Sequence, residues 1–148
     1  MSQESLLLSI KPKWCQEIIT GHKTLECRKT LTKLKPPFKC VVYCTKDKNE
    51  TLVAPTRGGD VMILNGKVIG EFTCDSVEET RVPFPDAADE MDETVLERSC
   101  VPYMELHEYV GRRPLYCYGI KDFQLYKIPK KLEDYGITSA PQSFRYVQ

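Results

Sequence analysis

Residues 6–29 constrain the fold most, because signals for a strand, a helix and a second strand follow one another within this short block. An apolar run opens the block and stops at Pro12, which suits the first position of a helix because its missing N–H costs no hydrogen bond there. Gly21 suits the left-handed residue that follows a last helical turn. We therefore expect a short amphipathic helix between two strands.

The second of these strands carries an unusual set of polar residues. Side chains alternate between the two faces of a strand. We therefore expect Thr24, Glu26 and Arg28 on one face and Lys23 on the other, together with Leu25. A polar face with both charge signs is uncommon in the core of a small domain. It is either a solvated outer face or the floor of a polar pocket.

Length and composition favour one globular domain over residues 1–148, since 148 residues suffice for a core and 41% of them are hydrophobic. No apolar run approaches the roughly 20 residues that cross a bilayer. The first residues also lack the basic segment of a signal peptide. We expect a cytoplasmic protein with no membrane association. The seven cysteines form no C-x-x-C pair, so core thiols are favoured over disulfides or a metal site, and no cofactor is expected.

A net charge of zero conceals segregation along the chain. Residues 11–48 hold ten Lys or Arg against three acids, whereas residues 71–109 hold two Arg against twelve acids, and residues 110–148 are basic again. A basic face built from both chain ends would suit phosphate, although ordinary solvated surfaces would give the same counts. The acidic excursion, about 83–100, contains a segment at 86–97 that could meet a basic protein partner.

The clearest local signal later in the chain is Asn65-Gly66 between two apolar runs. This dipeptide favours a type I′ hairpin that joins residues 61–64 to residues 67–74. A helix is expected to begin near Asp92 within the acidic excursion.

Several other segments have readable patterns. Residues 39–46 are expected to form a strand that is buried on both faces. A second Pro-to-Gly helix is expected over 102–110. Residues 115–126 should form one long strand or a bent pair, with Gly119 as the kink. The tail, 129–148, is apolar enough to pack back on the rest. Many short strands with few helices favour a closed or nearly closed barrel.

Two segments resemble a known family. SIKPKWCQEIITGHKTLECRK, residues 9–29, is similar to the opening of ASCH domains, a branch of the PUA-like β-barrel superfamily that shares a helix followed by a G-x-K-x-x-E-x-R-like strand. APQSFRYV, residues 140–147, resembles a closing segment of some bacterial and phage members. The resemblance implies an α+β fold, a small PUA-like mixed or antiparallel β-barrel flanked by two or three short helices. It also implies that the basic chain ends meet.

The first functional hypothesis is a cleft that binds RNA or a modified nucleotide. Lys11, Lys23 and Arg28 would hold phosphate near a helix start, and Glu26 would accept from the exocyclic amine of a base. The competing interpretation of the same residues is a structural ion pair on an outer strand face.

Other residues would complete such a site. Trp14 is either a stacking platform for a base or a core anchor on the apolar face of its helix. In the tail, Gln142, Ser143 and Arg145 have donors and acceptors that could read base edges, or that could simply anchor a loop.

The second hypothesis is a small hydrolase, either an amidohydrolase acting on an acylated nucleoside or a ribonuclease. One bacterial branch of the family resembled here deacetylates N4-acetylcytidine through the Lys and second Thr of G-x-K-T-x-T-x-R, with a Glu from a later helical region. This sequence retains Lys23 but has Glu26 in place of that Thr. Glu26 would then activate water while Lys23 polarises a carbonyl. Glu97, Glu105 and Glu108 all qualify as the third residue.

Overall fold

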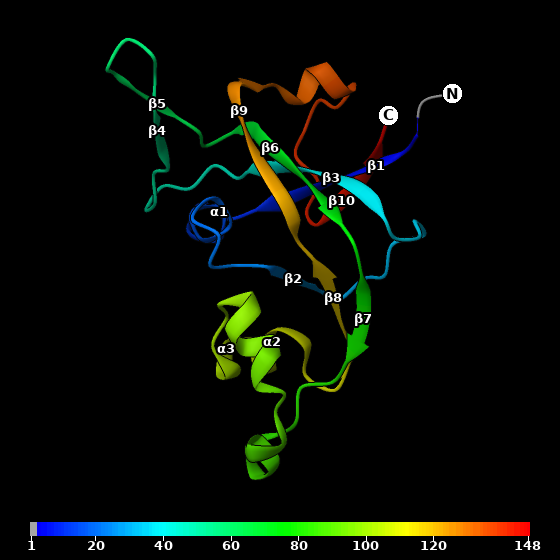
Figure 1. The fold of residues 1–148 in the computed structure, drawn as a ribbon. Coiled ribbons are helices and arrows are strands. Elements are labelled where there is room, and N and C mark those ends of the chain that lie inside the picture. The colour runs from blue at the N-terminus through cyan, green and yellow to red at the C-terminus, as the bar shows by residue number, and fades with distance from the viewer. Residues whose placement is uncertain (1–2) are drawn as a thin grey trace.

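The structure is a computed structural model that describes residues 3–148 (Figure 1). Its elements, in chain order, are β1 (Ser5–Ile10), α1 (Pro12–Ile19), β2 (Leu25–Arg28), β3 (Phe38–Cys44), β4 (Val53–Pro55), β5 (Val61–Ile63), β6 (Lys67–Cys74), β7 (Val77–Thr80), the 3-10 helix η1 (Pro85–Glu90), α2 (Glu93–Ser99), α3 (Tyr103–Val110), β8 (Leu115–Gly119), β9 (Lys121–Lys130), the 3-10 helix η2 (Leu132–Tyr135) and β10 (Phe144–Val147). This mixture of short strands and few short helices is the α+β class expected from the sequence.

The strands form three sheets. A five-stranded sheet has the order β10-β1-β3-β6-β9, a three-stranded sheet has the order β2-β8-β7, and β4 pairs with β5. Among the strands of residues 3–148, β1 and β3 pair in parallel and the other pairs are antiparallel. The chain passes from β6 into β7 and from β8 into β9, so one bent two-stranded ribbon joins the two larger sheets (Figure 1). Over residues 3–148 no ladder closes these sheets into a barrel, which differs from the closed form that the strand count favours.

The continuous apolar run of β1 is explained by burial on both faces of the five-stranded sheet. Leu6, Leu8 and Ile10 pack with α1 on one face, whereas Leu7 packs with Ile137 and the tail on the other. A strand covered on both faces loses the alternation of polar and apolar residues. The tail therefore packs back on the sheet as expected, and its β10 pairs with β1 along the edge.

The expected helices are confirmed. Pro12 occupies the first turn of α1, and Gly21 follows the helix with φ 84°. The acidic excursion turns helical at Asp92, whose side chain caps α2 by accepting from the Thr94 N–H. Helix α3 ends at Gly111, as its Pro-to-Gly pattern predicts. No helix within residues 3–148 is long and apolar enough to cross a membrane.

The Asn65-Gly66 hairpin prediction is wrong. Strand β5 pairs with β4, and β6 pairs with β3 and β9 instead. A type I′ turn needs positive φ at both central residues, but Gly66 has φ 77° while Asn65 is not among the residues with positive φ. The Asn65 amide instead binds main-chain groups of Leu52, Glu50 and Thr45, which are remote in sequence. A turn does form at Asn65-Gly66, since Lys67 donates its N–H to the Leu64 carbonyl at 3.2 Å, but the segments on either side of it pair with other strands.

The strand break at Gly119 is confirmed as a bend between β8 and β9. Gly119 donates its N–H to the Ser76 carbonyl at 2.8 Å, and a Cβ at this position would overlap the Asp75 carboxylate. A larger residue at this position would require the Asp75 and Ser76 side chains to move.

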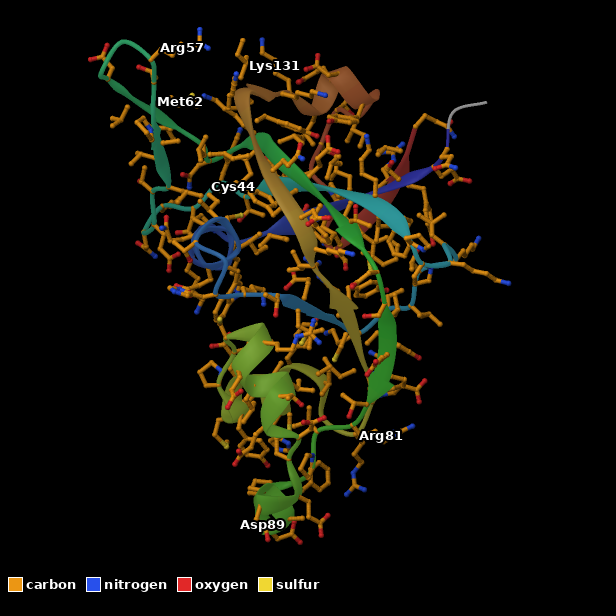
Figure 2. The ribbon with its side chains drawn as sticks, in the orientation of Figure 1. Cys44, Arg57, Met62, Arg81, Asp89 and Lys131 are labelled. Carbon is orange, nitrogen blue, oxygen red and sulfur yellow. The ribbon has the colours of Figure 1, made fainter. Side chains whose placement is uncertain are left out.

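The charges of the chain are separated in space. Asp89 of the acidic excursion lies at one end of the molecule, and Arg57 and Lys131 lie at the opposite end (Figure 2). The helices α2 and α3 lie between the acidic end and β2 (Figure 1).

We expect Gly70→Ala to lower the free energy of unfolding by about 1–3 kcal/mol, the usual cost of overpacking. Gly70 lies in β6, where a Cβ would overlap the Gln124 carbonyl oxygen and come within 2.7 Å of Phe123 Cζ. Urea unfolding measures the change. Gly58→Ala is the matched control, because its nearest neighbour would be Thr56 Oγ1 at 3.9 Å. Equal stability of the two variants would contradict the β6–β9 register.

Candidate functional site

A cleft of about 850 Å³ lies between α1, β2, α3 and the tail. Its size is within the range of small-molecule sites. Five parts of the chain supply its lining, namely the β1–α1 region, the strand β2 with the residues after it, Thr45 after β3, the segment from Val101 into α3, and the segment before β10. The lining comprises Ser9, Ile10, Lys11, Lys13, Trp14, Glu26, Cys27, Arg28, Lys29, Thr30, Thr45, Val101, Glu105, Leu106, Tyr109, Ala140, Pro141, Gln142 and Ser143.

The floor of the cleft contains a buried carboxylate between two cations. Glu26 Oε1 lies 3.2 Å from Lys23 Nζ, and Glu26 Oε2 accepts from Arg28 Nη2 at 2.8 Å. All three residues are buried, with exposed fractions of 1% for Lys23, 6% for Glu26 and 7% for Arg28. The polar face is therefore buried and not a solvated outer face, although Glu26 does lie between two cations as the ion-pair interpretation expects.

Burial and charge act in opposite directions on Glu26. Burial alone would raise the pKa of this carboxyl, but the charges of Arg28 and then Lys23, with a hydrogen bond from each, hold it below its ordinary value. Glu26 is therefore ionised at neutral pH, with a cation at each oxygen.

Lys23 does not lie on the face that strand alternation predicts. Its N–H donates to the Glu17 carbonyl, so Lys23 still belongs to the turn before β2 and its side chain joins Glu26. Lys23 Nζ also donates to the Ser99 carbonyl at 2.6 Å, at the C-terminal end of α2 where a cation is favoured. The ammonium lies behind Glu26 and is not among the cleft-lining groups.

Arg28 ties the tail to the first strand. Its Nη2 donates to the Ser9 carbonyl at 2.8 Å, and its Nη1 donates to the carbonyl and hydroxyl of Ser143 at 3.1 and 3.2 Å. Ser9 reinforces this connection by donating its hydroxyl to the Pro141 carbonyl at 2.7 Å and its N–H to the Ser143 carbonyl at 3.0 Å. Side chains thus bridge the gap between β2 and β1 that a closed barrel would fill with a ladder.

Cations and one carboxylate surround the opening. Lys11 and Lys29 are exposed, and Lys13 Nζ lies 3.8 Å from Glu105 Oε1. Of the three glutamates that the sequence left open, Glu105 alone lines the cleft. Gln142 is an exposed part of the tail wall.

Aromatic rings line the cleft from two helices. Trp14 is partly buried and packs against two core clusters, so it is a core residue that also lines the cleft. Lys13 and Lys23 place their ammonium groups 4.4 and 5.1 Å from its ring centroid. Tyr109 of α3 is 39% exposed, and Lys29 Nζ lies 4.7 Å from its ring centroid.

The residues expected at the site from the sequence are not all the residues that line the cleft. Arg145 is exposed on β10 and does not line the cleft, although its neighbours Gln142 and Ser143 do. Lys29 and Tyr109 were not anticipated. Lys29 directly follows Arg28 and could have been inferred from the basic run, whereas Tyr109 had no local signal because only the docking of α3 brings it there.

No family model and no curated protein sequence matches the chain. Among solved structures, the ASCH protein from Zymomonas mobilis has a TM-score of 0.69 and 16% identity, covering 97% of this chain and 87% of that one. Two point mutants of that protein also have a TM-score of 0.69 at 15% identity; they cover 99% and 97% of this chain, and 91% and 88% of their own. The chain therefore has the ASCH fold, as the resemblance of residues 9–29 implied.

We expect acid to destabilise the protein through Glu26. Because the folded-state pKa of Glu26 is depressed, its stabilising contribution is present above the unfolded pKa, near 4.5, and is lost as pH falls through the lower folded value. Glu26→Gln should be less stable at pH 7 and should lose less stability on acidification. The measurement is urea unfolding at a series of pH values. Glu108→Gln, on the exposed side of α3, serves as control. Parallel acid profiles for the wild type and Glu26→Gln would refute the buried ionised state.

Proposed function

We propose, from the ASCH fold and the composition of the cleft, that this protein binds single-stranded RNA or a nucleotide, with the base in the cleft and the phosphates at its rim. The observation that carries the proposal is the combination of apolar and aromatic walls with a rim of lysines. Bases offer flat apolar faces, and phosphates need cations at a distance from those faces. A nucleotide has both parts in the same relation.

The rim supplies the charge for phosphate. Lys11 and Lys29 are both exposed and both line the cleft, one at the start of α1 and the other directly after β2. Lys13 is partly neutralised by Glu105. Arg28, in contrast, has both terminal nitrogens engaged by protein oxygens, so it acts on the ligand by fixing the tail wall. Phosphate binding is therefore assigned to the lysines of the rim.

The walls supply surfaces for a base. Trp14 from α1 and Tyr109 from α3 both line the cleft, together with the apolar side chains of Val101 and Leu106. Stacking of a base on an aromatic ring contributes about 1–3 kcal/mol. This energy depends little on sequence, since every base has an aromatic face.

The geometry favours binding over hydrolysis. A general base works best with a pKa near the operating pH, whereas the Glu26 carboxyl has a lowered pKa and a cation at each oxygen. Lys23 would have to leave the Ser99 carbonyl and emerge from behind Glu26 before it could polarise a substrate. The two residues of the hydrolase hypothesis are instead suited to holding the floor rigid.

We expect the double variant Lys11→Glu/Lys29→Glu to bind a short single-stranded RNA at least about tenfold more weakly at low salt, because two attractions to phosphate become repulsions. The slope of log affinity against log salt should fall by about 0.7 for each phosphate that the protein no longer neutralises. Fluorescence anisotropy of a labelled ten-nucleotide RNA at several salt concentrations measures both quantities.

Lys127→Glu is the matched control, since Lys127 is an exposed lysine of β9 outside the cleft. RNA affinity and salt slope unchanged in the double variant would overturn the proposal. Turnover of an acylated nucleoside such as N4-acetylcytidine by the wild-type protein would instead support the hydrolase.

A further inference from the structure

The strand β2 forms the edge of its sheet, and this edge opens into the cleft. In the order β2-β8-β7, no strand within residues 3–148 pairs with β2 on the side away from β8. Three consecutive residues, Glu26, Cys27 and Arg28, line the cleft. Side chains on a single strand face alternate, so three consecutive residues reach a cleft only where the strand is met from its edge.

The hydrogen-bond alternation of the sheet identifies which main-chain groups point to that edge. Gly119 donates its N–H to Ser76 of the β7 side, at 2.8 Å, so Gly119 and Cys117 turn their main-chain groups toward β7. Ile120 donates its N–H to the Thr24 carbonyl at 2.9 Å. The even-numbered residues Tyr116 and Tyr118 of β8 therefore turn their main-chain groups toward β2. The two hydrogen bonds agree: odd-numbered residues of β8 face β7, and even-numbered ones face β2.

In this arrangement, Glu26 and Arg28 use their main-chain groups to pair with Tyr118 and Tyr116. Cys27, opposite Cys117, occupies the alternate position, where N–H and C=O both point away from β8. The sheet does not use the main-chain donor and acceptor of Cys27, and they are directed at the cleft edge. Buried main-chain groups of this kind almost always have a partner.

We propose that the main-chain N–H and C=O of Cys27 bind the Watson–Crick edge of a base held in the cleft. This inference rests on the proposed function and names the part of the ligand that is read. In an extended residue the N–H and C=O point the same way and lie side by side, which presents one donor beside one acceptor. Uracil, cytosine, adenine and guanine each present the complementary pair on that edge.

The surroundings of Cys27 suit a base better than an added peptide strand. A base bound in this way continues the plane of the sheet, so its two faces meet side chains from the walls, among which Trp14, Val101 and Leu106 line the cleft. A peptide strand would need a longer free edge, whereas β2 has four residues. The lysine rim also favours an anionic ligand.

The Cys27 amide can be observed directly in protein labelled with 15N-cysteine, which gives one amide signal for each of the seven cysteines. Loss of a signal in Cys27→Ala assigns it. On titration with uridine, cytidine and adenosine monophosphates, we expect the Cys27 amide proton to move downfield and to exchange more slowly with solvent. Cys40 and Cys74, in the five-stranded sheet, are internal controls that should stay in place.

Methylated bases test the same interaction through affinity. An oligonucleotide whose best-binding base is methylated at the ring nitrogen of its Watson–Crick edge, for example 3-methyluridine, should bind at least about tenfold more weakly than the 5-methyl isomer, because both hydrogen bonds are blocked.

The outcomes separate this inference from the proposed function. If RNA binding depends on Lys11 and Lys29 but the Cys27 signal stays in place and the two methyl isomers bind equally, the edge interaction is wrong and the RNA-binding proposal stands. If no RNA or nucleotide binds at any salt concentration, both fail.

Discussion

The arrangement of the cleft depends on one buried carboxylate, Glu26, held between Lys23 and Arg28. Burying an ion costs several kcal/mol unless partners replace its water, and here each oxygen of Glu26 has a cation within 3.2 Å. The cations in turn reach outward, since Lys23 donates to the Ser99 carbonyl and Arg28 donates to Ser9 and Ser143. A chain of hydrogen bonds therefore runs from the end of α2, across the floor, to the tail.

This series of hydrogen bonds sets the distance between the α2–α3 wall and the tail wall of the cleft. On one side it holds the junction of α2 and α3, from which Val101 and Glu105 line the cleft, and on the other it holds the segment before β10. Such a buried polar network is highly directional, and losing one member leaves the others with charges that water cannot reach. The network thus fixes the geometry of the site.

The same network explains why the sheets remain open. In a closed barrel, β2 would pair with β1 or β10; here the Arg28 side chain spans that gap. The free edge of β2 consequently lies inside the cleft with the main-chain groups of Cys27 directed at it. The open edge, a liability in an isolated sheet, is the surface to which we assign the proposed ligand.

Much of the local structure was predictable from the sequence, because it depends on neighbours along the chain. Pro12 and Gly21 delimit α1, Asp92 caps α2, and Gly119 marks the bend of the ribbon. The segment around Glu26 was also identifiable, since charged residues on an otherwise core-like strand indicate a polar site. The tertiary structure decided the rest. It directed Asn65 to remote main-chain groups, turned Lys23 toward Ser99, and brought Tyr109 beside Lys29. These interactions join residues far apart in the chain, and their energies exist only once the sheets and helices have packed, so no local pattern encodes them.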